Sequence, residues 1–339
     1  MSTIEFTLPA ALAAHEPPEA RGLTRDGVRL LVGTGSGVTH RRFADLPLLL
    51  RAGDVLVVNT SATIPAALAV PDRPLTVHFS TERPDGRWLV EVRQRSDATT
   101  RVYHGVLRGE RYRLPGGALV TVREPYGSGR LWAADVQTPM PVLEYLARYG
   151  RPIRYGYVAR SWPLACYQTV FATQPGSAEM PSAGRPFTER LVTRLVAAGV
   201  QFAPVLLHTG VASPEAGERP YPERFAVGAA TAALVNTARA EGRRVIAVGT
   251  TAVRALESAA DDVGVLAAAN GWTDLIVTPE RGVRVVNGLV TGFHEPHASH
   301  LDLVGAIAGR QLLDRCYQVA LDAGYLWHEF GDLNLLLPG

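Results

Sequence analysis

Short apolar runs that end abruptly at small or polar residues recur in the second half of the chain. Residues 245–248 form one such run, which stops at a Gly-Thr-Thr triplet before a helical pattern begins, and residues 205–207 form another. Stretches with helical spacing, such as residues 189–198 and 231–241, alternate with these runs. The alternation of strand-like and helix-like segments predicts an α/β fold.

The triplet Gly249, Thr250 and Thr251 is predicted to be the turn between a strand and a helix. In open α/β sheets, ligands bind in the crevice at the carboxyl ends of the strands, where the backbone N–H groups and hydroxyls of such a turn lie. We therefore expect these three residues to contact a ligand. The alternative is an ordinary turn whose threonines cap the helix and whose following arginine, Arg254, pairs with Glu257. Spacing alone leaves both interpretations open.

A different pattern interrupts the chain between about residues 76 and 126. Residues 76–79, 88–92, 112–114 and 118–122 read as short strands separated by turn sequences such as Pro-Asp-Gly and Pro-Gly-Gly. Because the segments on both sides have α/β character, this part is predicted to be a small antiparallel β domain inserted into the main domain.

Two local sequences imitate functional motifs. Residues 33–37, GTGSG, look like a phosphate-binding loop, but a strand-like segment follows them instead of a helix, so a hairpin is expected. His294, His297, His300 and Asp302 offer metal-binding groups, but Pro296 interrupts the run and no acidic partner motif accompanies it. We expect no metal.

Composition narrows the class of protein. The 339 residues are 47% hydrophobic, and no apolar run approaches the roughly 18 residues that a membrane span needs. The first twenty residues lack the basic and apolar regions of a secretion signal, so a cytoplasmic protein without a membrane partner is expected. Cys166 and Cys316 are the only cysteines. All 34 basic residues are arginine, and the absence of lysine excludes Schiff-base catalysis and covalent pyridoxal phosphate.

A series of short blocks resembles one enzyme family. In order along the chain they are HRRFADLP at residues 40–47, GDVLVVN at 53–59, YQTVFA at 167–172, FTE at 187–189, VIAVGTTAVRALESAA at 245–260, GWTD at 271–274, TGFHEP at 291–296 and FGD at 330–332. Together they resemble the S-adenosylmethionine:tRNA ribosyltransferase-isomerases of queuosine biosynthesis. The matched blocks extend along nearly the whole chain.

The resemblance implies a fold and a substrate. It implies an α/β S-adenosylmethionine-binding domain made of residues 1–66 and 152–339, with a β-barrel-like domain inserted at residues 67–151. S-adenosylmethionine is expected as a substrate. The blocks place it at Gly249, Thr250, Thr251, Arg254, Trp272, Thr273, Asp274, Phe293 and Asp332.

In this family the ribosyl unit of S-adenosylmethionine is transferred to a 7-aminomethyl-7-deazaguanine in tRNA, with loss of adenine and methionine and rearrangement to an epoxycyclopentane. The sulfonium makes methionine a leaving group and acidifies the neighbouring C5′ hydrogens, so the reaction needs acid and base groups but no redox cofactor. Histidine suits both roles. His208 and His294 each follow a predicted strand and are the catalytic candidates, although either is also compatible with a purely structural role.

The chain also departs from the family pattern. An acidic residue and two arginines of the family are replaced by Thr60, Ala62 and Ala67, and a histidine is replaced by Pro186. Near Glu223 only the glutamate of a histidine-rich segment remains. These departures suggest a divergent paralogue, whose acceptor region we expect at Asn59, Arg185, Tyr221 and Glu223.

Three functions follow from these patterns. The departures favour a ribosyl transferase or isomerase that acts on a small molecule other than tRNA, or on the sulfonium substrate itself. Authentic modification of tRNA is the alternative. The third hypothesis is a binding module that retains S-adenosylmethionine but has lost catalysis.

Overall fold

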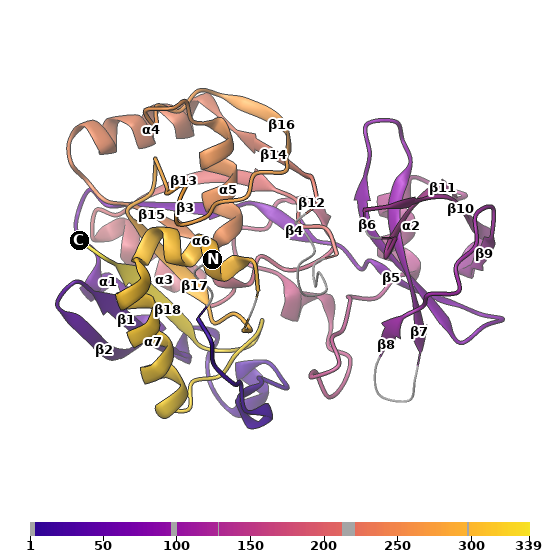
Figure 1. Ribbon diagram of the computed structural model, residues 1–339, viewed down its shortest axis with the longest axis horizontal. Coiled ribbons are helices and arrows are strands. Elements are labelled where there is room, and N and C mark those ends of the chain that lie inside the picture. Colours follow the sequence, from indigo (N-terminus) through magenta and orange to yellow (C-terminus); the bar gives the residue numbers. More distant parts are fainter. Residues whose placement is uncertain (1–3, 96–99, 128, 212–220, 297) are drawn as a thin grey trace.

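The computed structural model describes residues 4–95, 100–127, 129–211, 221–296 and 298–339. Within these residues the larger sheet has nine strands (Figure 1). Their spatial order is β16 (Ala269–Thr273), β14 (Glu223–Val227), β13 (Gln201–Leu207), β3 (Val55–Asn59), β15 (Val245–Val248), β17 (Gly288–Gly292), β18 (Leu333–Leu337), β1 (Arg29–Thr34) and β2 (Gly37–Arg42).

The four central strands β13, β3, β15 and β17 run parallel to one another. Strands β14 and β18 are antiparallel to their inner neighbours, while β16 and β2 form antiparallel pairs at the two margins. Strand β1 is parallel to β18. Parallel neighbours need crossover connections between them, and such connections in a largely parallel sheet are typical of the predicted α/β architecture.

Both faces of the sheet are covered, because its strands are apolar at successive positions. Val55 and Val57 pack into the core that contains α4 (Ala229–Ala240), α5 (Thr250–Ala259), α6 (His300–Ala308) and α7 (Arg310–Asp322). The intervening Leu56 and Val58 pack on the opposite face, in the core that contains α1 (Leu46–Leu49) and α3 (Glu189–Ala197). Strands buried on both faces read as continuous hydrophobic runs, as they do here.

A second, antiparallel sheet lies to the right in Figure 1. It contains, in spatial order, β5 (Ala67–Val70), β6 (Leu75–Glu82), β7 (Trp88–Arg95), β11 (Leu131–Gln137), β10 (Ala118–Tyr126) and β9 (Arg111–Leu114), with β8 (Thr100–Val102) paired to β7. Strand β5 also lies against β9, so the sheet curls into a nearly closed barrel around its own core. The helix α2 (Val142–Tyr149) packs on that core through Tyr145 and Leu146.

The fold class expected from the sequence, an α/β domain with an antiparallel barrel-like insertion, is confirmed. The exact domain bounds at residues 66 and 152 stay a prediction. The hairpin expected at residues 33–37 is confirmed, since β1 and β2 are antiparallel neighbours joined there. Among the described residues, no helix has the length and apolar character that crossing a membrane requires.

Candidate active site

One edge of the larger sheet collects the polar groups singled out in the sequence. The parallel strands β3, β13, β15 and β17 all end at this edge, so Asn59, His208, Gly249 and His294 lie along it. The antiparallel strands β14 and β18 begin there instead. The edge therefore also receives Glu223 and Asp332, and Thr273 at the end of β16.

The Gly-Thr-Thr triplet forms the predicted turn between β15 and α5. Gly249 has a φ of 89°, in the region that favours glycine, and its N–H donates to the carbonyl of Val290 on β17. No threonine side chain caps the helix, because Gly249 occupies the capping position. The hydroxyl of Thr251 is shielded from solvent and has no hydrogen-bond partner. The alternative in which the threonines are helix caps is wrong, and Thr251 retains an unused polar group at this edge.

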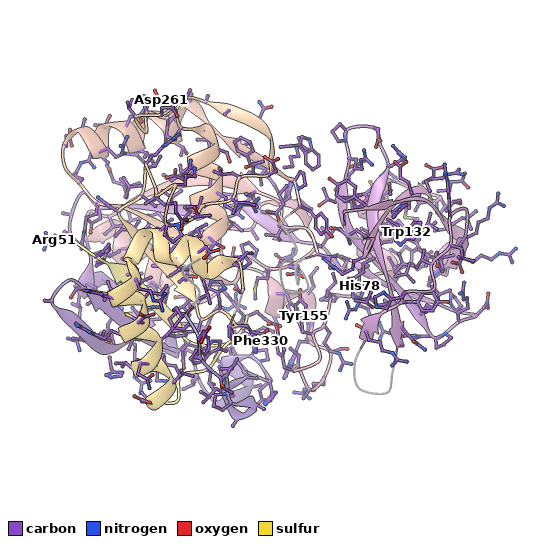
Figure 2. The ribbon with its side chains drawn as sticks, viewed as in Figure 1. Arg51, His78, Trp132, Tyr155, Asp261 and Phe330 are labelled. Carbon is purple, nitrogen blue, oxygen red and sulfur yellow. The ribbon has the colours of Figure 1, made fainter. Side chains whose placement is uncertain are left out.

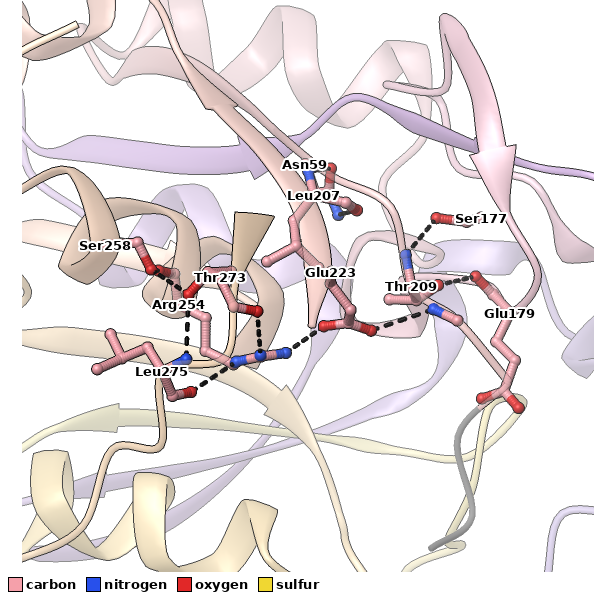
Figure 3. Close-up of polar contacts among 11 residues, drawn as sticks. Asn59, Ser177, Glu179, Leu207, Thr209, Glu223, Arg254, Ser258, Thr273 and Leu275 are labelled. Carbon is pink, nitrogen blue, oxygen red and sulfur yellow. Dashed lines mark hydrogen bonds and ion pairs between the residues drawn. The ribbon is translucent and has the colours of Figure 1, made fainter. Parts of the chain in front are cut away.

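Arg254 links three elements at the same edge (Figure 3). Its guanidinium forms an ion pair with Glu223 and donates to the carbonyls of Leu275 and Thr273, at 3.1 and 3.4 Å. The carboxylate of Glu223 also accepts a hydrogen bond from the N–H of Gly210, at 3.1 Å. Arg254 and Glu223 are 12% and 13% exposed as side chains, so the pair is largely withdrawn from water.

The other members of the Gly-Trp-Thr-Asp block differ in exposure. Thr273 is buried, and its hydroxyl contacts the hydroxyl of Ser258 at 2.5 Å. The neighbouring Trp272 and Asp274 are exposed. The indole of Trp272 is therefore accessible from solvent.

The alternative pairing of Arg254 with Glu257 is wrong. Glu257, which is one turn further along α5, is buried and forms an ion pair with Arg281 at 2.8 Å. It also accepts hydrogen bonds from the N–H groups of Arg284 and Val285. Helical spacing brings Arg254 and Glu257 close together, but each forms its ion pair with a residue from another part of the chain.

His208 follows β13 and belongs to a hydroxyl relay. Its Nδ1 lies 2.7 Å from Oγ of Ser61, which in turn lies 2.6 Å from Oγ of Ser177. Burial lowers the pKa of His208 to about 4, with a smaller contribution from the charge of Arg224. The imidazole is therefore neutral near pH 7, and in the tautomer whose Nδ1–H donates to Ser61, Nε2 is the ring nitrogen that accepts a proton.

The backbone beside His208 leaves room only for glycine. A Cβ added at Gly176 in β12 (Gln174–Ser177) would lie 2.5 Å from the imidazole. Strand β12 pairs with β4 (Ser61–Thr63), which carries Ser61. The small two-stranded sheet thus packs directly on the imidazole and fixes its orientation.

Asn59 joins the ends of β3 and β13. Its amide nitrogen donates to the carbonyl of Leu207 at 2.8 Å, and its oxygen accepts from the N–H groups of Leu207 and Ser61 at 3.0 and 3.1 Å. All of these bonds are internal to the protein. The observed contacts of Asn59 therefore position the residues on either side of His208.

His294 is partly buried after β17. Its Nε2 lies 3.0 Å from the hydroxyl of Thr291, its ring stacks on His300 with centroids 4.9 Å apart, and its backbone N–H donates to the hydroxyl of Tyr317. Burial lowers its pKa well below the usual range, and the charges of His300 and His328 add to this. The adjacent Phe293 packs among buried aromatic rings.

Asp332 has all of its observed contacts inside the protein. Its carboxylate accepts hydrogen bonds from the backbone N–H groups of Arg29 and Leu326, both at 2.8 Å, and forms an ion pair with Arg29 at 2.9 Å. These contacts join the starts of β1 and β18. Asp332 thus braces this part of the edge.

The expected acceptor residues do not converge on one point. Glu223 pairs with Arg254, as described above. Arg185 is 2% exposed and forms an ion pair with Glu19 at 2.9 Å. The ring of Tyr221 lies against Tyr126 and beneath the guanidinium of Arg130. Tyr221 therefore contacts side chains of the barrel-like domain.

Several polar groups at the edge were not found by sequence reasoning. They include Ser61 and Ser177 beside His208, and a stack in which His328 lies 3.9 Å from the ring of Tyr157. The hydroxyl of Tyr157 donates to Glu329 at 2.5 Å, and burial raises the pKa of that carboxyl group. His328 has a φ of 73°, which is unusual for a residue other than glycine and was invisible to pattern analysis.

Of the four potential metal ligands noted in the sequence, His294, His297, His300 and Asp302, the structure describes three. His297 lies outside the described residues. His294 and His300 contact each other ring to ring, and among the residues that the structure describes no group of three or more potential ligands is suitable for a metal ion.

The similarity to known proteins extends over nearly the whole chain. A model of the queuosine biosynthesis protein family matches residues 1–336. The chain is 36% identical over 355 residues to the S-adenosylmethionine:tRNA ribosyltransferase-isomerase of Acidiphilium cryptum, with 99% of each chain covered. The corresponding enzyme of Moorella thermoacetica is also 36% identical, with 98% of each chain covered.

The chain is also similar to a solved structure over nearly its full length. The crystal structure of S-adenosylmethionine tRNA ribosyltransferase from Thermotoga maritima is 28% identical in sequence and aligns with a TM-score of 0.55. The alignment covers 98% of this chain and 99% of that one.

Proposed function

Because the chain belongs to the queuosine biosynthesis protein family, we propose that it transfers and isomerises the ribosyl unit of S-adenosylmethionine with tRNA as the acceptor. The observation that carries the proposal is the similarity to enzymes of that name over nearly the full length of both chains. The chain is an enzyme of the transferase and isomerase class. This similarity supports a tRNA acceptor better than the small-molecule acceptor that the sequence departures favour.

The arrangement of the sheet edge supports binding of S-adenosylmethionine near α5. Thr251 supplies an unpartnered hydroxyl, Trp272 an exposed indole, and Arg254 a guanidinium whose carboxylate partner is Glu223. An indole face attracts a sulfonium by the same electrostatic interaction that attracts other cations. We assign Trp272 to the sulfonium and the Gly249 turn to the polar part of the substrate.

His208 is our candidate base. Its lowered pKa keeps the imidazole neutral, and in the tautomer whose Nδ1–H donates to Ser61, Nε2 can remove a proton made acidic by the neighbouring sulfonium. The hydroxyls of Ser61 and Ser177 form a relay that orients the ring as the proton is taken up. His294 contacts the hydroxyl of Thr291 and stacks on His300, so we assign it an orienting role.

The replaced family residues occupy positions with internal partners. The hydroxyl of Thr60 donates to the carbonyl of Val205, and Ala62 is buried in β4. The residues present at these positions are thus accommodated within the fold. The absence of the family's charged residues does not by itself require a different acceptor.

The test uses the purified protein, S-adenosylmethionine and tRNA that carries the 7-aminomethyl-7-deazaguanine precursor. We expect release of adenine and methionine together with an epoxycyclopentane nucleoside in the digested tRNA, measured by mass spectrometry. Adenine released only with a small-molecule acceptor would favour the paralogue hypothesis. Binding of S-adenosylmethionine without adenine release would leave the binding-module hypothesis.

A further inference from the structure

A groove of about 690 Å³ lies on the β18–β1–β2 side of the sheet, apart from the Arg254 and His208 networks. Its walls come from segments that are distant in sequence but meet around the starts of β18 and β1 and the end of β2. The lining residues are Arg21, Leu23, Gly27, Arg29, His40, Arg41, Arg42, Asp45, Leu326 and Asp332. Four arginines and one histidine thus face two aspartates.

Both aspartates are already engaged by the protein. Asp332 is paired with Arg29, and the carboxylate of Asp45 accepts a hydrogen bond from the backbone N–H of Arg42 at 3.0 Å. Within the described ranges, the guanidinium groups of Arg21, Arg41 and Arg42 form no ion pair with a carboxylate. The groove therefore has a positive charge that internal partners do not cancel.

The individual arginines differ in how they are held. The guanidinium of Arg21 donates to the carbonyl of Phe330 at 2.8 Å, while its Nε is shielded from solvent and has no partner. Arg41 and Arg42 are exposed at the end of the margin strand β2. The guanidinium of Arg41 donates to the carbonyl of His40 at 2.9 Å. One partly fixed guanidinium and two exposed ones can contact successive anionic groups of a long ligand.

The groove lies along the same edge of the sheet as the candidate active site. Strands β17, β18, β1 and β2 are successive neighbours, and the end of β17, the starts of β18 and β1 and the end of β2 lie at one edge. Three strand spacings place Arg42 about 15 Å from the strand that leads to His294. An extended ligand can occupy both regions together.

We propose that this groove binds the sugar-phosphate backbone of the acceptor RNA next to the nucleotide that reacts, an inference that rests on the proposed function. Arginine guanidinium groups contact phosphate oxygens through paired hydrogen bonds, and such contacts position a nucleic acid without reading its sequence. Exposed charges on a margin strand also prevent association between sheets, and this second explanation predicts no effect on RNA binding.

The test compares the double variant Arg41→Gln and Arg42→Gln with a matched control, Arg51→Gln. Arg51 is also exposed, but it precedes β3 and so lies at the opposite edge of the sheet. In Figure 2, Arg51 is on the far left and Phe330 is near the middle of the molecule. Affinity of the full chain for the precursor tRNA is measured across a series of salt concentrations. A third variant, Arg41→Lys with Arg42→Lys, retains the charge.

We expect the double glutamine variant to lower the slope of log affinity against log salt by roughly 1.4 to 1.8 and to weaken binding about tenfold or more at low salt. The control and the lysine variant should keep the wild-type slope. Slopes unchanged by the double variant, or lowered equally by the Arg51 control, would overturn the proposal.

The same samples separate this proposal from the proposed function. A protein that binds tRNA through Arg41 and Arg42 but forms no epoxycyclopentane nucleoside would retain the groove and refute the activity. A protein that modifies tRNA with no dependence on Arg41 or Arg42 would retain the activity and refute the groove. Thermal unfolding with S-adenosylmethionine should be alike for all variants, because the exposed side chains of β2 are remote from α5.

Discussion

Replacing His208 with glutamine tests whether the imidazole is held neutral in the folded protein. Glutamine retains a group that can hydrogen-bond to Ser61, so the main change is the loss of a titrating side chain. The folded-state pKa of His208 is about 4, whereas an unperturbed histidine titrates near 6.5. The unfolded chain therefore binds a proton at a pH where the folded chain does not.

The sign of the effect follows from this difference. Between those two pKa values the unfolded state takes up more protons, so stability falls as the pH falls. For a single group with this shift, the free energy of unfolding decreases by about 2 kcal/mol between about pH 7 and about pH 5. The variant lacks this contribution, so its stability should depend less on pH by that amount.

Urea unfolding of the wild type and the variant at the two pH values measures the difference. The other buried histidines titrate in both proteins, and their contributions cancel when the two pH dependences are subtracted. Equal pH dependence would mean that His208 protonates freely in the folded state and would refute the argument for a neutral imidazole. In the transfer reaction, the same variant should lower turnover by roughly a hundredfold or more while S-adenosylmethionine still raises the melting temperature.

Three further predictions concern the same edge. Arg254→Ala should lower the unfolding free energy by roughly 2 to 3 kcal/mol, because the Glu223 carboxylate loses its partner. In urea unfolding, adding Glu223→Gln to this variant should cause a smaller loss than Glu223→Gln causes alone, which would show that the two residues are coupled. Gly176→Ala should impair turnover more than Gly228→Ala, since only the first methyl group meets an imidazole, and steady-state kinetics would reveal equal rates if the contact were unimportant. Arg254→Ala should also abolish the melting-temperature shift caused by S-adenosylmethionine, and an unchanged shift would assign Arg254 to structure alone.

The local parts of the site could be predicted from sequence. The apolar run of β15 and the glycine after it predict the turn before α5, because each signal lies within a few residues. The strand-like character of the barrel segment is visible for the same reason. The parallel order of the central strands then determines that residues following different strands meet at one edge.

The partners of those residues could not be predicted. Ser177 reaches Ser61 across 116 positions, and Asp332 reaches Arg29 across 303, so neither contact leaves a periodic signal. Glu257 and Arg254 share a helix but face different partners, which depends on packing against Arg281 and Glu223. Register and pairing between distant segments decide these contacts, and one sequence contains no direct measure of either.

The position of β18 has a consequence for how the chain reaches its fold. Strand β18, formed by Leu333–Leu337, lies between β17 and β1, so the first hairpin gains its inner neighbour only after residues 43–332 have been synthesised. Until then Leu30 and Leu31 of β1 have an open hydrogen-bonding edge and an incomplete core, conditions that expose a nascent chain to misassociation. Deleting residues 333–339 would therefore divide the sheet internally instead of shortening its margin.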